Sequence, residues 1–152
     1  EMPANVVKRI LDQADPQMRR DINEILKYPE NSAGSIMTTE YISLKPDMTV
    51  DEAIKRIREN AIDKETIYTC YVTEKRRLLG VVTLKDLLLV KDNELRISDI
   101  METNVIAANT SDDREEIAQL LSKYNFLAIP VLDNEDLMVG IITFDDVMDV
   151  IE

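Results

Sequence analysis

The sequence predicts an α/β fold made of two copies of one β-α-β-β-α unit, related by a pseudo-two-fold axis. Two pairs of matching segments carry this prediction. Ile-Met-Thr-Thr-Glu-Tyr at 36–41 matches Ile-Met-Glu-Thr-Asn-Val at 100–105, with an offset of 64 residues. Leu-Gly-Val-Val-Thr-Leu-Lys-Asp at 79–86 matches Val-Gly-Ile-Ile-Thr-Phe-Asp-Asp at 139–146, with an offset of 60. A period of this length indicates a duplicated supersecondary unit rather than a solenoid.

Each copy opens with a short extended piece, 42–44 and 105–107, which is followed by a helix. Thr49 and Glu52 have the spacing of a capping box at the start of the first helix, and Asp113 and Glu116 take the equivalent positions in the second copy. Apolar residues then recur at helical spacing: Val50, Ala53, Ile54 and Ile57 in the first copy, and Ile117, Leu120, Leu121 and Tyr124 in the second.

Two apolar strands and a further helix complete each copy. A charged turn joins the strands, at 74–77 in the first copy and at 133–136 in the second. The expected ranges are strands 66–72 and 78–83 with helix 84–90, and strands 127–131 and 137–143 with helix 144–151.

Residues 1–35 precede the first copy and have a different pattern. One short helix is expected at 5–15 and another from Pro16, whereas 28–35 has the composition of a linker. Because two short helices cannot bury their own apolar faces, we interpret them as the end of a larger helical domain. The predicted domains are therefore 1–35, 36–92 and 93–152.

Charge and composition exclude several classes of function. Thirty acidic and eighteen basic residues give a net charge of −12, which repels nucleic acid and anionic lipid. Residues 111–152 hold eleven of the acids and only two bases. The sequence contains no histidine, so imidazole chemistry is excluded, and Cys70 is the only cysteine, which fits a reducing compartment. No apolar run reaches the roughly 18 residues of a membrane span.

The pattern Gly-x-x-Thr-x-x-Asp occurs at the end of both copies, where a strand is expected to meet a helix. Thr83 with Asp86, and Thr143 with Asp146, can serve simply as capping pairs. The same arrangement also offers N–H groups to a phosphate and a carboxylate to ribose hydroxyls. Its occurrence at two equivalent positions favours a binding role, and both interpretations remain open.

Paired units with an apolar-Met-Thr opening and this closing pattern resemble a tandem of CBS domains over residues 36–152. Further motifs resemble the cytosolic region of MgtE magnesium transporters. They are Tyr-Pro-Glu-Asn-Ser-Ala-Gly at 28–34, Glu-Thr-Ile-Tyr at 65–68, Lys-Tyr-Asn-Phe-Leu-Ala-Ile-Pro-Val at 123–131, and Asp-Asp-Val-Met-Asp-Val at 145–150. The resemblance implies that the helices before residue 36 belong to the family's N-terminal helical domain, and that a membrane domain follows Glu152.

For magnesium, the resemblance and the residues point to the same helix. Asp145, Asp146, Asp149 and Glu152 are three or four residues apart, a spacing at which like charges destabilise a helix unless a cation offsets them. By position, Asp146 and Asp149 match magnesium ligands of the family. Asn125 stands where the family often has Asp, so its amide oxygen offers less charge. A solvated acidic face is the alternative interpretation.

For ATP, the resemblance implies a site formed by the first copy. Tyr68, Thr83, Lys85 and Asp86 occupy the matching positions, and Ile106 would line the base pocket. Lys85 replaces an Arg that is frequent in the family and keeps its charge. The alternatives are that Lys85 is an ordinary surface residue and that Tyr68 belongs to the core.

Together these features predict the cytoplasmic regulatory domain of a bacterial inner-membrane magnesium transporter. The module is expected to form a homodimer, to act on its own transmembrane domain, and to sense magnesium and ATP. Magnesium would bridge acidic faces that otherwise repel each other and would thereby favour the closed pore. The alternative is an adenine-nucleotide-sensing CBS module attached to another channel or to an enzyme. Catalysis by the module itself is not expected, because the sequence lacks histidine and a Gly-rich phosphate loop.

Overall fold

The computed structural model describes residues 9, 28–60 and 68–151, with only the backbone at 149–151. The chain divides into two compact units: unit 1 combines Glu1–Thr39 with Ile106–Glu152, and unit 2 is Glu40–Val105. The helices expected at 5–15 and from Pro16 lie outside the described residues, apart from residue 9, which is helical. In the described part of the chain, every helix is too short or too polar to cross a membrane.

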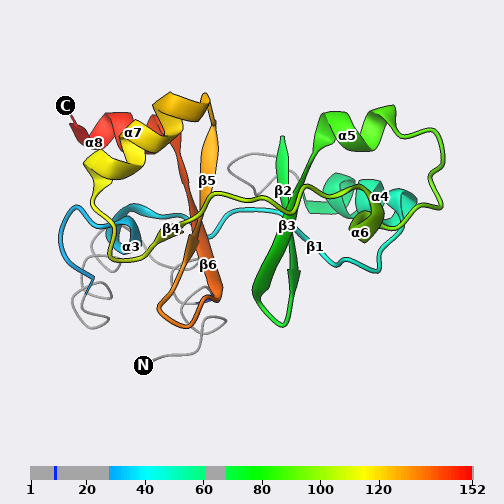
Figure 1. Ribbon diagram of the computed structural model, residues 1–152, viewed down its shortest axis with the longest axis horizontal. Coiled ribbons are helices and arrows are strands. Elements are labelled where there is room, and N and C mark those ends of the chain that lie inside the picture. Colours follow the sequence, from blue (N-terminus) through cyan, green and yellow to red (C-terminus); the bar gives the residue numbers. More distant parts are fainter. Residues whose placement is uncertain (1–8, 10–27, 61–67, 152) are drawn as a thin grey trace. The chain divides into compact units, whose positions relative to one another are not determined.

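Unit 2 contains a three-stranded sheet with the order β1-β2-β3 (Figure 1). Strand β1 pairs in parallel with β2, and β2 pairs antiparallel with β3. The β-α-β-β-α order predicted for the first copy is confirmed. The elements are β1 (Ser43–Leu44), α4 (Val50–Asn60), β2 (Thr69–Glu74), β3 (Arg77–Thr83), α5 (Leu84–Leu89) and the short helix α6 (Ile97–Ile100).

Unit 1 repeats this architecture with a sheet of order β4-β5-β6 and the same pairing directions. The order predicted for the second copy is therefore confirmed as well. The elements are α3 (Ala33–Ile36), β4 (Ala108–Asn109), α7 (Arg114–Tyr124), β5 (Ala128–Leu132), β6 (Met138–Thr143) and α8 (Phe144–Ile151).

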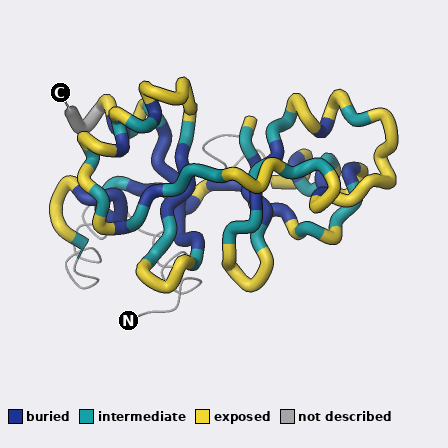
Figure 2. The backbone as a smooth tube through the Cα atoms, viewed as in Figure 1, coloured by how far each residue is buried: buried dark blue, intermediate teal, exposed yellow. Residues whose placement is uncertain are grey.

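Each unit has its own apolar core between the sheet and its helices. Figure 2 shows the central strands buried and the hairpin ends exposed. In unit 2 the core includes Leu44, Val50, Ile57, Cys70, Val72, Val82 and Leu87. In unit 1 it includes Ala33, Met37, Ile117, Leu121, Ile129, Val131, Ile142 and Val147.

The starts of α4 and α7 use the caps that the sequence predicts, with one difference. At α4 the Glu52 carboxylate accepts the Thr49 N–H at 3.1 Å, and the Thr49 hydroxyl accepts the Glu52 N–H at 3.2 Å. The hydrogen bond from the Thr49 backbone lowers the pKa of Glu52. At α7 the Asp113 carboxylate accepts the N–H of Glu115 at 3.1 Å, rather than the N–H of Glu116 that a capping box would use.

The opening motif of each repeat pairs with the last strand of the other repeat. Thr38 and Ile141 exchange two backbone hydrogen bonds of 2.8 Å within unit 1, and Val81 and Glu102 exchange two of 2.9 Å within unit 2. The predicted boundaries 36–92 and 93–152 follow the repeats along the sequence. In the structure, the opening motif of each repeat packs instead in the compact unit that contains the last strand of the other repeat.

The glycine in both closing motifs has a steric reason. Both strands carry glycine where the opening segment crosses them. A Cβ at Gly80 would lie 2.7 Å from the Glu102 carbonyl oxygen, and a Cβ at Gly140 would lie 2.9 Å from the Thr38 carbonyl oxygen. The glycine of the closing motif is therefore required by the opening motif that lies against it.

Three expectations about local structure are corrected, and one helix was not predicted. Residues 105–107 form no strand; β4 starts at Ala108, because Ala108 and Asn109 are the residues in register with β5. The segment expected as a linker contains helix α3, since its N–H groups find acceptors in the loop before α7. The unpredicted helix α6 is capped by the Asp99 carboxylate, which accepts the Arg96 N–H at 3.0 Å. Tyr124, predicted as a member of the apolar stripe of α7, is 43% exposed.

Candidate functional site

The junction between β3 and α5 is the first candidate site. The Thr83 hydroxyl accepts the Asp86 N–H at 3.1 Å, and the Asp86 carboxylate accepts the Thr83 N–H at 3.1 Å. This reciprocal cap confirms the structural role predicted for the pair. Because Asp86 is exposed, one of its carboxylate oxygens can still accept hydrogen bonds from a ligand.

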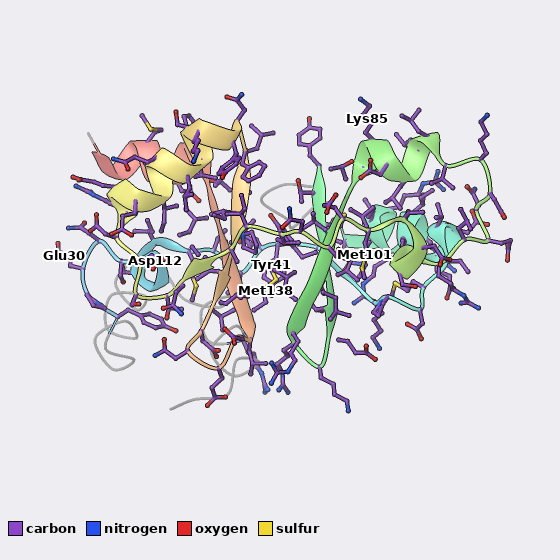
Figure 3. The ribbon with its side chains drawn as sticks, in the orientation of Figure 1. Glu30, Tyr41, Lys85, Met101, Asp112 and Met138 are labelled. Carbon is purple, nitrogen blue, oxygen red and sulfur yellow. The ribbon has the colours of Figure 1, made fainter. Side chains whose placement is uncertain are left out.

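Tyr68 and Lys85 lie beside this cap. The Tyr68 carbonyl oxygen accepts the Leu84 N–H at 2.9 Å, which places Tyr68 next to the first residue of α5. Its side chain is 63% exposed, so the alternative interpretation of Tyr68 as a core residue is wrong. Lys85 is exposed, and Figure 3 shows its side chain extending outward from the start of α5. An aromatic face, an ammonium and a carboxylate therefore share one edge of unit 2.

Ile106, the fifth residue assigned to the nucleotide, belongs to unit 1. It is half-buried and packs against the core of that unit. The structure thus brings four of the five predicted nucleotide residues together, and Ile106 stays a prediction.

The junction between β6 and α8 repeats the cap in unit 1. The hydroxyl of Thr143, which is buried, accepts the Asp146 N–H at 3.1 Å. Asp145 is exposed and Asp146 is half-buried. Asp149 lies on α8, one turn further along, but its side chain is not among those described, and Glu152 lies outside the described residues.

Asn125 ends helix α7 in a left-handed conformation, with φ 56° and ψ 37°. Two residues later, the Leu127 carbonyl oxygen accepts the N–H of Phe144, the first residue of α8, at 2.9 Å. Helices α7 and α8 also pack together, as Figure 1 shows. The end of α7 and the start of α8, with Asp145 and Asp146, therefore lie at the same edge of the sheet.

These donors suit magnesium in kind but do not enclose an ion. Magnesium prefers oxygen ligands, keeps several waters and needs only one or two carboxylates. Asp145, Asp146 and the Asn125 amide oxygen provide that chemistry. Among the described residues, however, no group of three or more carboxylates and thiolates is placed to hold a metal ion.

The end of α7 carries an exposed aromatic surface that the sequence did not predict. The rings of Tyr124 and Phe126 stack with centroids 5.4 Å apart and planes at 17°, and the Lys123 ammonium lies 5.2 Å from the Tyr124 ring centroid. Leu127 beside them is 64% exposed. The residue that could have indicated this surface is Asn125. Asparagine tolerates the left-handed conformation that ends a helix, so the residues after it no longer follow the apolar stripe of α7.

Among the described residues, the titratable groups whose pKa shifts most, Cys70 and Tyr71, are structural. Burial raises the pKa of the Cys70 thiol to about 12, so the thiol stays protonated at neutral pH and cannot serve as a thiolate nucleophile. Burial also raises the pKa of Tyr71, whose ring packs edge-on against Tyr41 with centroids 5.8 Å apart. Both Cys70 and Tyr71 are inaccessible from solvent.

The two copies of this architecture match a known family. A model of the CBS domain fits residues 33–92 and again residues 97–152. The chain belongs to the CBS domain family. The tandem CBS fold predicted from the repeats is thereby confirmed.

The relatives of this CBS pair include magnesium transporters. It is 43% identical over 146 residues to the magnesium transporter MgtE of Thermus thermophilus, covering 95% of this chain and 32% of the relative. It is 42% identical over 133 residues to MgtE of Enterococcus faecalis, covering 87% of this chain and 29% of the relative. The chain therefore spans about a third of the length of these relatives.

Among solved structures, the CBS pair is similar to the cytosolic domain of the Mg²⁺ channel MgtE in complex with ATP. The TM-score is 0.80 at 42% identity, and the match covers 93% of this chain and 57% of that one. A second structure, the soluble part of a magnesium transporter, gives a TM-score of 0.81 at 39% identity. The predicted resemblance to the cytosolic region of MgtE transporters is confirmed.

Proposed function

We propose that this CBS pair is the cytoplasmic regulatory module of a bacterial inner-membrane magnesium transporter, and that it responds to magnesium and to ATP. The observation that carries the proposal is the 42% identity, over 93% of the chain, to the cytosolic domain of MgtE. Within the full protein, the module would act on a transmembrane domain and would form a homodimer.

The edge of unit 2 at the start of α5 supports binding of ATP. Asp86 can accept hydrogen bonds from ribose hydroxyls while it caps the helix, and the exposed Lys85 ammonium can neutralise phosphate charge. The exposed ring of Tyr68 offers a face for stacking with the base.

The edge of unit 1 at the start of α8 supports the response to magnesium. Asp145 and Asp146 place two carboxylates on the first turn of α8, and Asp149 follows one turn later. Asn125 would add an amide oxygen, and Glu152 a further carboxylate. A magnesium ion bridging these groups to carboxylates of a neighbouring subunit or domain would offset their repulsion and favour a compact state, to the extent that it binds that state more tightly.

The alternative function is sensing of adenine nucleotides alone, on behalf of another channel or an enzyme. Two weaker similarities favour it. The chain is 27% identical over 116 residues to an inosine-5'-monophosphate dehydrogenase of Methanocaldococcus jannaschii. It is also similar to the structure of CBSX2 in complex with AMP, with a TM-score of 0.66 at 26% identity. This alternative predicts nucleotide binding without any response to magnesium.

Calorimetric titration of the 152-residue chain with magnesium tests the proposal. The double variant Asp145→Asn/Asp146→Asn is expected to bind magnesium at least tenfold more weakly, about 1.4 kcal/mol, because two carboxylates become neutral amides. A matched control is Glu115→Gln/Glu116→Gln, which removes the same charge from the first turn of α7 and is expected to keep the affinity. Equal affinities for both double variants and the unmodified chain would count against a site at α8.

A further inference from the structure

Residues 28–34, called here the anchor segment, are bonded to the loop that precedes α7. The N–H of Ala33 donates to the Asp112 carbonyl oxygen at 2.8 Å, and the N–H of Gly34 donates to the Thr110 carbonyl oxygen at 2.8 Å. In the opposite direction, the Arg114 N–H donates to the Asn31 carbonyl oxygen at 2.9 Å. Three backbone hydrogen bonds therefore join a segment that resembles a linker to a part of the chain some eighty residues away.

The shape of the anchor segment is fixed from within. Asn31 has a φ of 66°, a left-handed conformation that asparagine tolerates and β-branched residues do not. The Ser32 hydroxyl donates to the Pro29 carbonyl oxygen at 2.6 Å. Gly34 lies against the Tyr28 ring so closely that a Cβ there would come within 2.7 Å of a ring carbon. With Ala33 buried in the core, the segment is expected to move together with the loop it is bonded to.

Helix α7 extends from this contact to the candidate magnesium site. Arg114 is its first residue, so the Asn31 carbonyl accepts one of the N–H groups that a helix start leaves without a partner. Its 11 residues span about 16 Å, and Ile117 and Leu121 hold it in the core. Three residues beyond its last residue, the Leu127 carbonyl oxygen accepts the N–H of Phe144, beside the carboxylates of α8.

We propose that the anchor segment positions α7 for magnesium binding, so that the anchored placement of α7 and the magnesium-bound state of the α8 edge favour each other. This inference rests on the proposed function. A helix that is bonded at its start to the anchor segment and packed against α8 is the kind of rigid element that can couple two sites. Because such coupling is reciprocal, magnesium must stabilise the anchor segment by the same factor by which the anchored segment raises the affinity for magnesium.

Amide hydrogen exchange of the 152-residue chain, with and without millimolar magnesium, tests this coupling. The amides of Ala33, Gly34 and Arg114 are expected to exchange about fivefold or more slowly with magnesium, the lower end of typical coupling. The control amides are those of Val81 and Glu102 in unit 2, which also donate backbone hydrogen bonds between distant segments. Their exchange rates are expected to stay unchanged. Equal slowing of both sets would indicate general stabilisation and would contradict the inference.

Two variants of Asn31 separate positioning from simple stability. Asn31→Val cannot easily keep φ at 66° and is expected to lower the magnesium affinity about fivefold or more, whereas Asn31→Gly keeps the conformation and the affinity. If Asn31→Val only lowers the melting temperature, the inference is wrong and the magnesium site stands. If the unmodified chain shows no binding of magnesium, both the proposed function and the inference are wrong.

Discussion

Asp86→Asn is expected to weaken ATP binding about ten- to a hundredfold, because a hydrogen bond to a charged group contributes about 1.5–3 kcal/mol. The substitution is chosen to spare the fold. The asparagine side chain keeps an oxygen that can accept the Thr83 N–H, so the cap of α5 persists. Calorimetric titration with ATP, together with the melting temperature of the variant, measures both effects.

The duplicated architecture supplies the matched control for this experiment. Asp146 holds the same position in unit 1 as Asp86 holds in unit 2, and its N–H is bonded to a threonine hydroxyl at the same distance of 3.1 Å. Asp146→Asn is therefore expected to leave ATP affinity unchanged while it weakens magnesium binding. Equal loss of ATP affinity in the two variants, or no loss in either, would rule out a specific role for Asp86.

Gly80→Ala and Gly140→Ala are each expected to lower the free energy of unfolding by about 1–3 kcal/mol, the usual cost of overpacking. At Gly80 the new Cβ would lie 2.7 Å from the Glu102 carbonyl oxygen and 3.0 Å from the Met101 sulfur. At Gly140 it would lie 2.8 Å from the Met37 sulfur and 2.9 Å from the Thr38 carbonyl oxygen. In both places the pairing between an opening segment and a strand must shift.

Urea denaturation checks this expectation, with Ser122→Ala on the exposed face of α7 as the control, for which a change within about 0.5 kcal/mol is expected. Because the closest atom at Gly140 belongs to a flexible side chain and the closest atom at Gly80 is a backbone oxygen, Gly140→Ala is expected to cost less than Gly80→Ala. Glycine variants as stable as the unmodified chain would contradict the steric account of the repeated motif.

Features with a local cause could be predicted from the sequence. The cap of α4 depends only on Thr49 and Glu52, and the cap of α5 only on Thr83 and Asp86, so both could be identified by spacing. The strand pair of unit 2 followed from its apolar runs. Its turn was shorter than expected, because Lys75 and Arg76 both adopt positive φ, at 51° and 68°, and form a two-residue connection without the usual glycine or asparagine.

Features that depend on distant partners could not be predicted. Nothing in residues 36–38 indicates that Thr38 pairs with Ile141, a hundred residues away, because the opening motif is equally compatible with either repeat. Helix α3 could not be predicted for the same reason, because its N–H groups donate to carbonyl oxygens of residues 110–112. A strand was expected at 105–107, but β4 forms at Ala108–Asn109, where the backbone is in register with β5.

The candidate site also combines features with a local cause and features that could not be predicted from local sequence. Thr83 and Asp86 come together because they flank one strand-helix junction, and the hydrogen bond from Leu84 to the Tyr68 carbonyl oxygen brings Tyr68 beside them. Their role in binding a nucleotide stays a prediction. Helical periodicity groups Tyr124 with the apolar stripe of α7, whereas in the structure Tyr124 stacks on Phe126 just beyond the left-handed turn at Asn125 and is exposed. The magnesium ligands remain a proposal, because the side chain of Asp149 and all of Glu152 lie outside the described residues.

Small-angle X-ray scattering of the chain across a magnesium titration tests the response to magnesium most directly. We predict a dimeric mass, and a radius of gyration that falls as magnesium rises into the millimolar range, with little change for Asp145→Asn/Asp146→Asn. A radius of gyration that stays constant over the whole titration, in a chain that still binds ATP, would contradict magnesium sensing and would favour a module that responds to nucleotides alone.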